Sequence, residues 1–120
     1  MRPIVLAAGL LASPAAFAFP ITLSGQICDT VFGICAPTTV ELQGGGRATL
    51  TVDLLGTVMS SPIQWRYTPA TRTVDFRLSG YILSGTVAGS CGQGAGTVPT
   101  PPSLVPLYGS TMDVVWSLCR

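Results

Sequence analysis

The sequence of 120 residues contains no histidine, no lysine and no asparagine. Without histidine or lysine, a serine or cysteine nucleophile lacks its usual activating base, and Schiff-base chemistry lacks its side-chain amine. Without asparagine there is no acceptor for N-glycosylation. The use of arginine alone as the basic residue, together with abundant alanine, glycine and proline, points to a GC-rich bacterial genome. These absences favour a protein that is not an enzyme and has no cofactor.

Charge is scarce and balanced. Five arginines beyond residue 18 face five acids, which gives a net charge of zero. The charged residues are Arg47, Arg66, Arg72, Arg77, Arg120, Asp29, Glu41, Asp53, Asp75 and Asp113. A neutral and thinly charged surface argues against nucleic acid as a partner and against electrostatic capture by anionic membranes.

Paired carboxylates are the one catalytic route that this composition leaves open, as in glycoside hydrolysis. Glu41, Asp53 and Asp75 fall at outward positions of expected strands, and Asp29 falls in an expected turn. Solvated surface charge is therefore the favoured role for these acids. A carboxylate-dependent hydrolase is the least favoured of the hypotheses.

The first 18 residues have the pattern of a secretory signal peptide. Arg2 supplies the positive start, Ile4 to Leu11 the apolar core, and Ala16-Phe17-Ala18 the small-x-small cleavage site. The apolar run is shorter than the roughly 20 residues that span a bilayer, and no later run is long enough. We therefore expect a single mature domain over residues 19–120, without a membrane span and located in the periplasm or outside the cell.

Four cysteines in an exported chain predict two disulfides. A metal site is disfavoured, because there is no closely spaced cysteine pair and no histidine. Four cysteines allow three pairings, among which the sequence does not choose. We favour pairing between neighbours along the chain, Cys28 with Cys35 and Cys91 with Cys119.

A hairpin at the centre of the chain carries the clearest strand signal. Apolar and polar residues alternate on both sides of the turn at residues 68–71. The expected register places Tyr67 opposite Val74 and Trp65 opposite Phe76. A further strand follows Gly80, and we favour a glycine bulge over a tight turn at residues 79–80.

The remaining segments complete a small all-β domain. Residues 20–27 and 112–119 alternate as strands, and Gly44-Gly45-Gly46 separates two strands as a hairpin loop. In that hairpin Gln43 faces Arg47. Residues 56–61 and the glycine- and proline-rich segment 89–109 are expected to be loops. This gives six to seven antiparallel strands, as a disulfide-linked sandwich or small barrel.

Two sets of apolar residues bear on function. Trp65, Tyr67, Phe76 and Trp116 fall at inward positions, which favours core packing over a ligand cavity with an aromatic interior. The expected loop 89–109 carries apolar residues that must fold back on the sheet or meet a partner. These candidate binding residues are Leu104, Val105, Leu107 and Tyr108.

The leading hypothesis is an exported, non-enzymatic domain that acts by binding or by structural assembly, with another protein or an envelope component as its partner. The alternative is a small ligand-binding barrel with an aromatic interior. The sequence does not indicate an oligomeric state.

Overall fold

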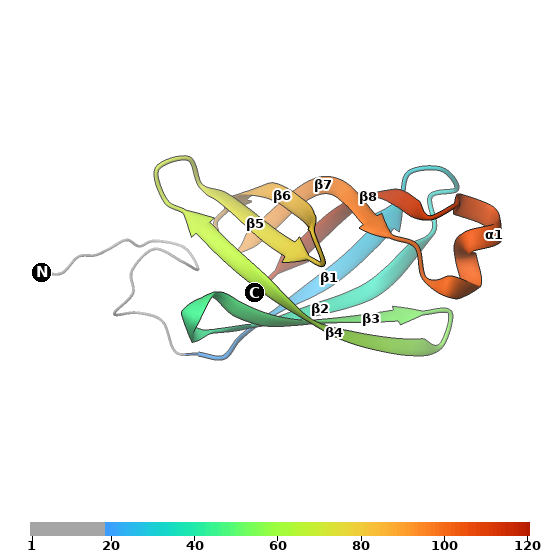
Figure 1. Cartoon of the computed structure of the whole chain (residues 1–120). Helices are drawn as coiled ribbons and strands as arrows, with labels where there is room; N and C mark the ends of the chain where they lie inside the picture. The colour runs from blue at the N-terminus through green and yellow to red at the C-terminus, as the bar shows by residue number, and fades with distance from the viewer. Residues whose placement is uncertain (1–18) are drawn as a thin grey trace, which may run out of the picture.

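The computed structural model describes residues 19–120, in which eight antiparallel strands form one closed barrel (Figure 1). The predicted signal peptide, residues 1–18, lies outside the described residues. The strands are β1 (Ile21–Asp29), β2 (Cys35–Gln43), β3 (Arg47–Leu54), β4 (Thr57–Thr68), β5 (Thr73–Leu78), β6 (Tyr81–Ala88), β7 (Cys91–Pro99) and β8 (Thr111–Cys119). The short helical turns are η2 (Gly44–Gly46), η3 (Pro102–Leu104) and α1 (Val105–Tyr108).

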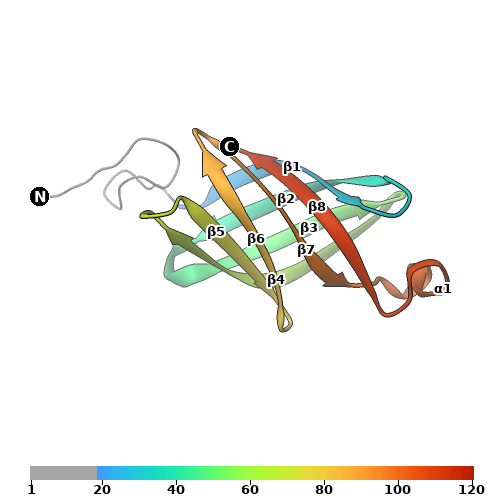
Figure 2. The ribbon, with the colours of Figure 1, turned by 90° about the horizontal axis from the view of Figure 1, so that it is seen from above.

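Each strand pairs with its neighbours in sequence, and β1 closes the ring by pairing with β8. This up-and-down order sends alternate connections to opposite ends of the barrel (Figures 1 and 2). The mouth end carries the connections at residues 30–34, 55–56, 79–80 and 100–110. The terminal end carries the three other connections together with Phe19 and Arg120. The predicted all-β fold is thus confirmed as a barrel, with eight strands instead of six or seven.

The register predicted for both hairpins is confirmed. Trp65 lies opposite Phe76, Tyr67 lies opposite Val74, and Gln43 lies opposite Arg47. Alternation fixes this outcome, because a shift of one residue would turn every apolar side chain of a strand outward.

The expected loop at residues 89–109 is wrong over its first half, because Cys91–Pro99 forms β7. Its glycines at 92, 94 and 96 occupy inward positions opposite Leu118, Trp116 and Val114. A Cβ on Gly96 would lie 2.5 Å from the side chain of Leu83, and one on Gly94 would overlap the backbone oxygen of Ser84. Glycine is therefore required by the close approach of neighbouring strands, although its intrinsic preference for strands is low.

Two further expectations about turns are wrong. Residues 57–61 belong to β4 instead of a loop, because Leu55-Gly56 connects β3 to β4 directly. Ser79-Gly80 is a two-residue turn and not a bulge, with φ of 48° and 85°. Positive φ at both central residues matches the twist of a hairpin, and Ser-Gly adopts it here without asparagine.

The core fills the barrel from its middle to the terminal end. Phe76 and Trp116 meet edge to face, with ring centroids 5.3 Å apart. An interior space lined by both rings measures about 10 Å³, which is too small for a ligand. The buried apolar residues are Ile21, Leu23, Ala36, Val40, Leu42, Ala48, Leu50, Ile63, Val74, Phe76, Leu83, Val114, Trp116 and Leu118.

Two disulfides join Cys28 to Cys35 and Cys91 to Cys119, which is the pairing between chain neighbours. Each disulfide links residues that lie directly opposite each other on adjacent strands. Their neighbours Ala36 and Leu118 point inward, so the disulfides lie on the outer face of the barrel. One disulfide lies at each end of the barrel.

Candidate functional site

The mouth end of the barrel holds an apolar cavity of about 460 Å³. Its floor is formed by inward residues of the strands, among them Leu50, Val52 and Val114. Its cover is formed by the connection at residues 100–110, hereafter the cap segment. A volume of this size lies within the range of about 300–1,000 Å³ that is usual for small-molecule sites.

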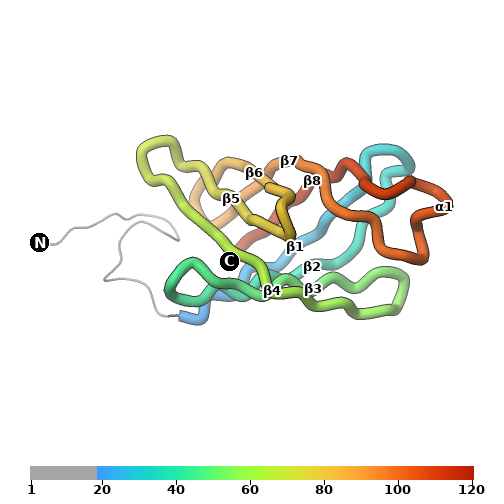
Figure 3. The backbone as a smooth tube through the Cα atoms, viewed as in Figure 1, coloured from blue at the N-terminus to red at the C-terminus, as the bar shows by residue number. Residues whose placement is uncertain are grey.

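Unequal strand lengths leave this space. The strand β4 has 12 residues, but its partner β5 has only 6. Figure 1 shows that the β5–β6 turn ends well short of the end that α1 occupies, and the tube in Figure 3 shows the same difference. The barrel wall is therefore low on one side, and fewer side chains reach the axis at the mouth.

The cap segment crosses the mouth from β7 to β8. Thr100 anchors its start, since the Thr100 amide donates to the carbonyl oxygen of Ser110 at 3.0 Å. The amide of Gly109 donates to the carbonyl oxygen of Val105 at 2.8 Å and closes the single turn of α1. Prolines at 101, 102 and 106 stiffen the segment.

Three of the four candidate binding residues line the cavity, namely Leu104, Leu107 and Tyr108. Leu107 nevertheless keeps 65% of its surface exposed, and Val105 is 43% exposed outside the lining. The predicted apolar loop therefore folds back over the barrel and still presents part of its apolar surface to solvent.

Asp29 is buried at the rim, with 4% of its surface exposed, which corrects the expectation of a solvated acid. Its Oδ1 accepts hydrogen bonds from the amides of Val31 and Phe32 at 3.0 and 2.6 Å, and its Oδ2 accepts one from Ile34 at 2.8 Å. Burial raises the pKa of Asp29, but these amides and the Tyr108 hydroxyl lower it by more, so the pKa lies below its ordinary value. The carboxylate thus holds the β1–β2 turn in shape.

Exposed apolar side chains surround the mouth. Phe32 is 59% exposed and packs edge to face on Tyr108, with ring centroids 5.5 Å apart. The exposed apolar rim consists of Val31, Phe32, Ile34, Leu55 and Leu107. A rim of this kind offers apolar contacts to an apolar molecule at the cavity entrance, which is favourable because apolar surface is removed from water.

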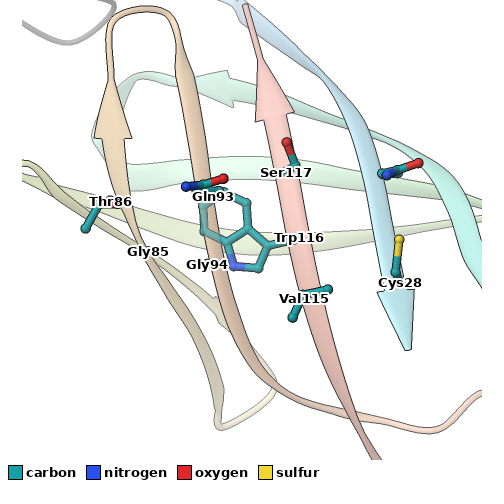
Figure 4. A pocket seen from close by; sticks show the side chains of 9 residues that line it. Cys28, Gly85, Thr86, Gln93, Gly94, Val115, Trp116 and Ser117 are labelled. Atoms are coloured by element: carbon teal, nitrogen blue, oxygen red, sulfur yellow. The ribbon is translucent and has the colours of Figure 1, made fainter. Parts of the chain in front are cut away.

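A second hollow of about 560 Å³ lies on the outer wall across β6, β7, β8 and β1. In Figure 4 the indole of Trp116 lies behind β7, where Gly85 and Gly94 place no side chain over it. Gln93, Ser117 and Thr86 give this hollow a polar lining. It is an open groove on the outer wall, and its aromatic floor, Trp116, is only 4% exposed.

The acids of the described residues do not form a catalytic pair at the mouth. Asp29 points inward, whereas Asp113 on the adjacent strand points outward and accepts from the Thr97 hydroxyl at 2.8 Å. Asp75 accepts from Ser84 at 2.7 Å, and Asp53 accepts from the Gly56 amide at 3.1 Å. Within residues 19–120 no three metal-ligating side chains come together.

The interior space beside Phe76 and Trp116, about 10 Å³, does not provide the ligand cavity with an aromatic interior that the sequence left as an alternative. The middle of the barrel is packed, and Tyr108 is the one aromatic residue in the lining of the mouth cavity. Sequence reasoning missed the floor of the cavity for two reasons. Val52 and Met112 have the same inward alternation as core residues, and only the lengths of the strands, which depend on where the turns fall, distinguish them. Met59 was expected to lie in the loop at residues 56–61, but it belongs to β4.

The fold and the cavity together define a closed up-and-down barrel with an apolar, capped mouth. Comparison of the chain with protein-family models, with curated proteins and with solved structures gives no match. In the part of the chain that the structure describes, no helix is long and apolar enough to cross a membrane.

Proposed function

We propose that this protein is an exported, non-enzymatic carrier that binds one small apolar molecule in the mouth cavity. The observation that carries the proposal is the apolar space of about 460 Å³ between the strands and the cap segment. Eight strands enclose an interior that is filled by side chains or that holds one small ligand. In this barrel side chains fill the middle, and the apolar space at the mouth is left for a ligand. Both disulfides favour an oxidising compartment, the periplasm or the outside of the cell.

The absence of histidine and lysine supports a binding role over catalysis. The buried carboxylate of Asp29 already accepts three backbone hydrogen bonds, so it is engaged in holding the turn. A general acid or base must instead be free to reach a reacting group.

The test uses the oxidised chain, residues 19–120, and the neutral fluorophore N-phenyl-1-naphthylamine. We expect saturable, one-to-one fluorescence enhancement. Replacing Leu104 and Leu107 together with serine removes most of the apolar cover and should weaken binding at least about tenfold, with a nearly unchanged thermal midpoint. Val115→Ser, on the outer wall, is the matched control. Equal binding by both variants would refute the cavity as the site.

A second candidate function is capture of a protein partner, which the exposed apolar rim favours. Val31→Ser together with Phe32→Ser, two rim residues outside the cavity lining, would then abolish partner capture and leave binding of the fluorophore intact. The reverse pattern, with fluorophore binding lost and partner capture retained, would place small-molecule binding at the rim instead.

A further inference from the structure

The lining of the mouth cavity carries one ionised group and no cation. Among the described residues that form it, Asp29 is the only charged one. Arg77 is close in sequence to the lining residue Leu78, but it is exposed on the outer face and does not line the cavity. An anion that enters the mouth therefore finds a carboxylate and no counter-ion.

Asp29 stays negative at neutral pH, because its hydrogen bonds hold its pKa below the ordinary value for an aspartate. The titratable group that faces it is Tyr108 of α1, and burial together with the Asp29 charge raises the pKa of Tyr108. On the adjacent strand Asp113 points away and bonds to Thr97. At neutral pH the charge at the mouth is thus a single negative one.

Two carboxylates in one weakly solvated space repel each other, and each also loses hydration when it is buried. An uncharged polar group avoids both costs. It can bond to hydroxyls in the lining, such as those of Ser61, Ser79 and Thr100, which can both donate and accept.

We propose that the mouth cavity selects uncharged chain-like molecules that end in a hydroxyl or similar neutral group, and that it rejects the carboxylates of the same chain length. This selectivity rests on the proposed function, and it specifies the class of ligand.

The experiment measures displacement of N-phenyl-1-naphthylamine by octan-1-ol and by octanoate at pH 7.5. We expect the alcohol to compete at least about tenfold better. At pH 4.5, near the pKa of about 4–5 of a simple carboxyl group, the difference should shrink. Equal competition at pH 7.5 would overturn the selectivity while leaving the proposed function standing. Failure of the fluorophore to bind at all would overturn the proposed function and the selectivity with it.

A matched pair of variants tests the charge argument directly. Ser61 lies on β4 opposite Leu50, and both residues line the cavity. Ser61→Lys adds a cation there, and Ser61→Met adds similar bulk without charge. We expect the lysine variant to shift the octanoate-to-octanol preference at least about tenfold toward octanoate relative to the methionine variant. If both folded variants keep the same preference, charge does not set selectivity and the proposal is wrong.

Discussion

The two halves of the barrel have the same alternation of inward and outward residues, but one half is packed and the other is hollow. From the middle to the terminal end, large side chains and glycines interlock, and Trp116 rests against the glycines of β6 and β7. Toward the mouth, aliphatic side chains of moderate size line a space that they do not fill. The comparison shows that an inward position on a strand is not by itself a core position. What decides is whether side chains from the opposite wall reach far enough to meet it.

The largest expected effect belongs to the packed half. Trp116→Ala should lower the free energy of unfolding by about 3–5 kcal/mol, because it removes a buried ring that contacts Phe76 and several strands. Chemical denaturation of the oxidised protein measures the loss. Val115→Ala, one residue away on the outer wall, should change stability by less than about 0.5 kcal/mol. Similar losses in both variants would mean that the faces of β8 are assigned wrongly.

The next largest losses of unfolding free energy are expected on removal of a disulfide, and the loss should differ between the two ends of the barrel. Replacing Cys91 and Cys119 with serine opens a loop with a sequence separation of 28 and should cost about 3.6 kcal/mol. Replacing Cys28 and Cys35 opens a loop with a separation of 7 and should cost about 2.5 kcal/mol. Urea unfolding of the two double variants gives the order. A larger loss at Cys28–Cys35 would show that local strain or packing outweighs loop entropy.

The difference between the two halves is tested most directly by introducing a phenylalanine into each half. Ala48→Phe overpacks the filled half and should cost about 1–3 kcal/mol. Ala36→Phe places its ring in the mouth cavity, so it should leave the thermal midpoint unchanged or raised and should abolish fluorophore binding. Thermal unfolding measures the change in stability, and fluorescence titration measures the loss of fluorophore binding. Equal destabilisation by the two substitutions would mean that the mouth is not hollow in solution.

The smallest effect is expected on the outer wall. Arg66 lies across from Asp75, whose carboxylate instead accepts from the Ser84 hydroxyl. Exposed cross-strand pairs contribute less than about 1 kcal/mol, so Arg66→Ala should change the free energy of unfolding by at most about 0.5 kcal/mol. A loss above about 1.5 kcal/mol in urea unfolding would reveal a structural role for Arg66.

The sequence predicts the strands whose neighbours are close along the chain, because alternation and turns are local signals. The register of β2 with β3 and of β4 with β5 follows from those signals alone. The strand β7 could not be predicted in this way. Its glycines are explained only by the backbone of Ser84 and the side chain of Leu83, which lie on another strand.

The candidate site was predicted in part. The apolar residues of the cap segment were recognisable because they interrupt a run of prolines and glycines. The role of Asp29 was not, since an aspartate in a turn has the same sequence signal whether it faces solvent or accepts from buried amides. Closure of the barrel decides between these cases, because it places Tyr108 beside the β1–β2 turn.

The positions of the disulfides have a consequence for resistance to proteolysis. A closed barrel has no free strand edge, so a terminal strand can peel away only after the seam between β1 and β8 has opened. One disulfide fastens β1 to β2 and the other fastens β7 to β8, so each strand of the seam is tied to the strand behind it. Proteases need a detached, extended segment, and neither terminal strand can peel away alone. Each terminal strand can therefore leave the barrel only together with the strand to which its disulfide joins it.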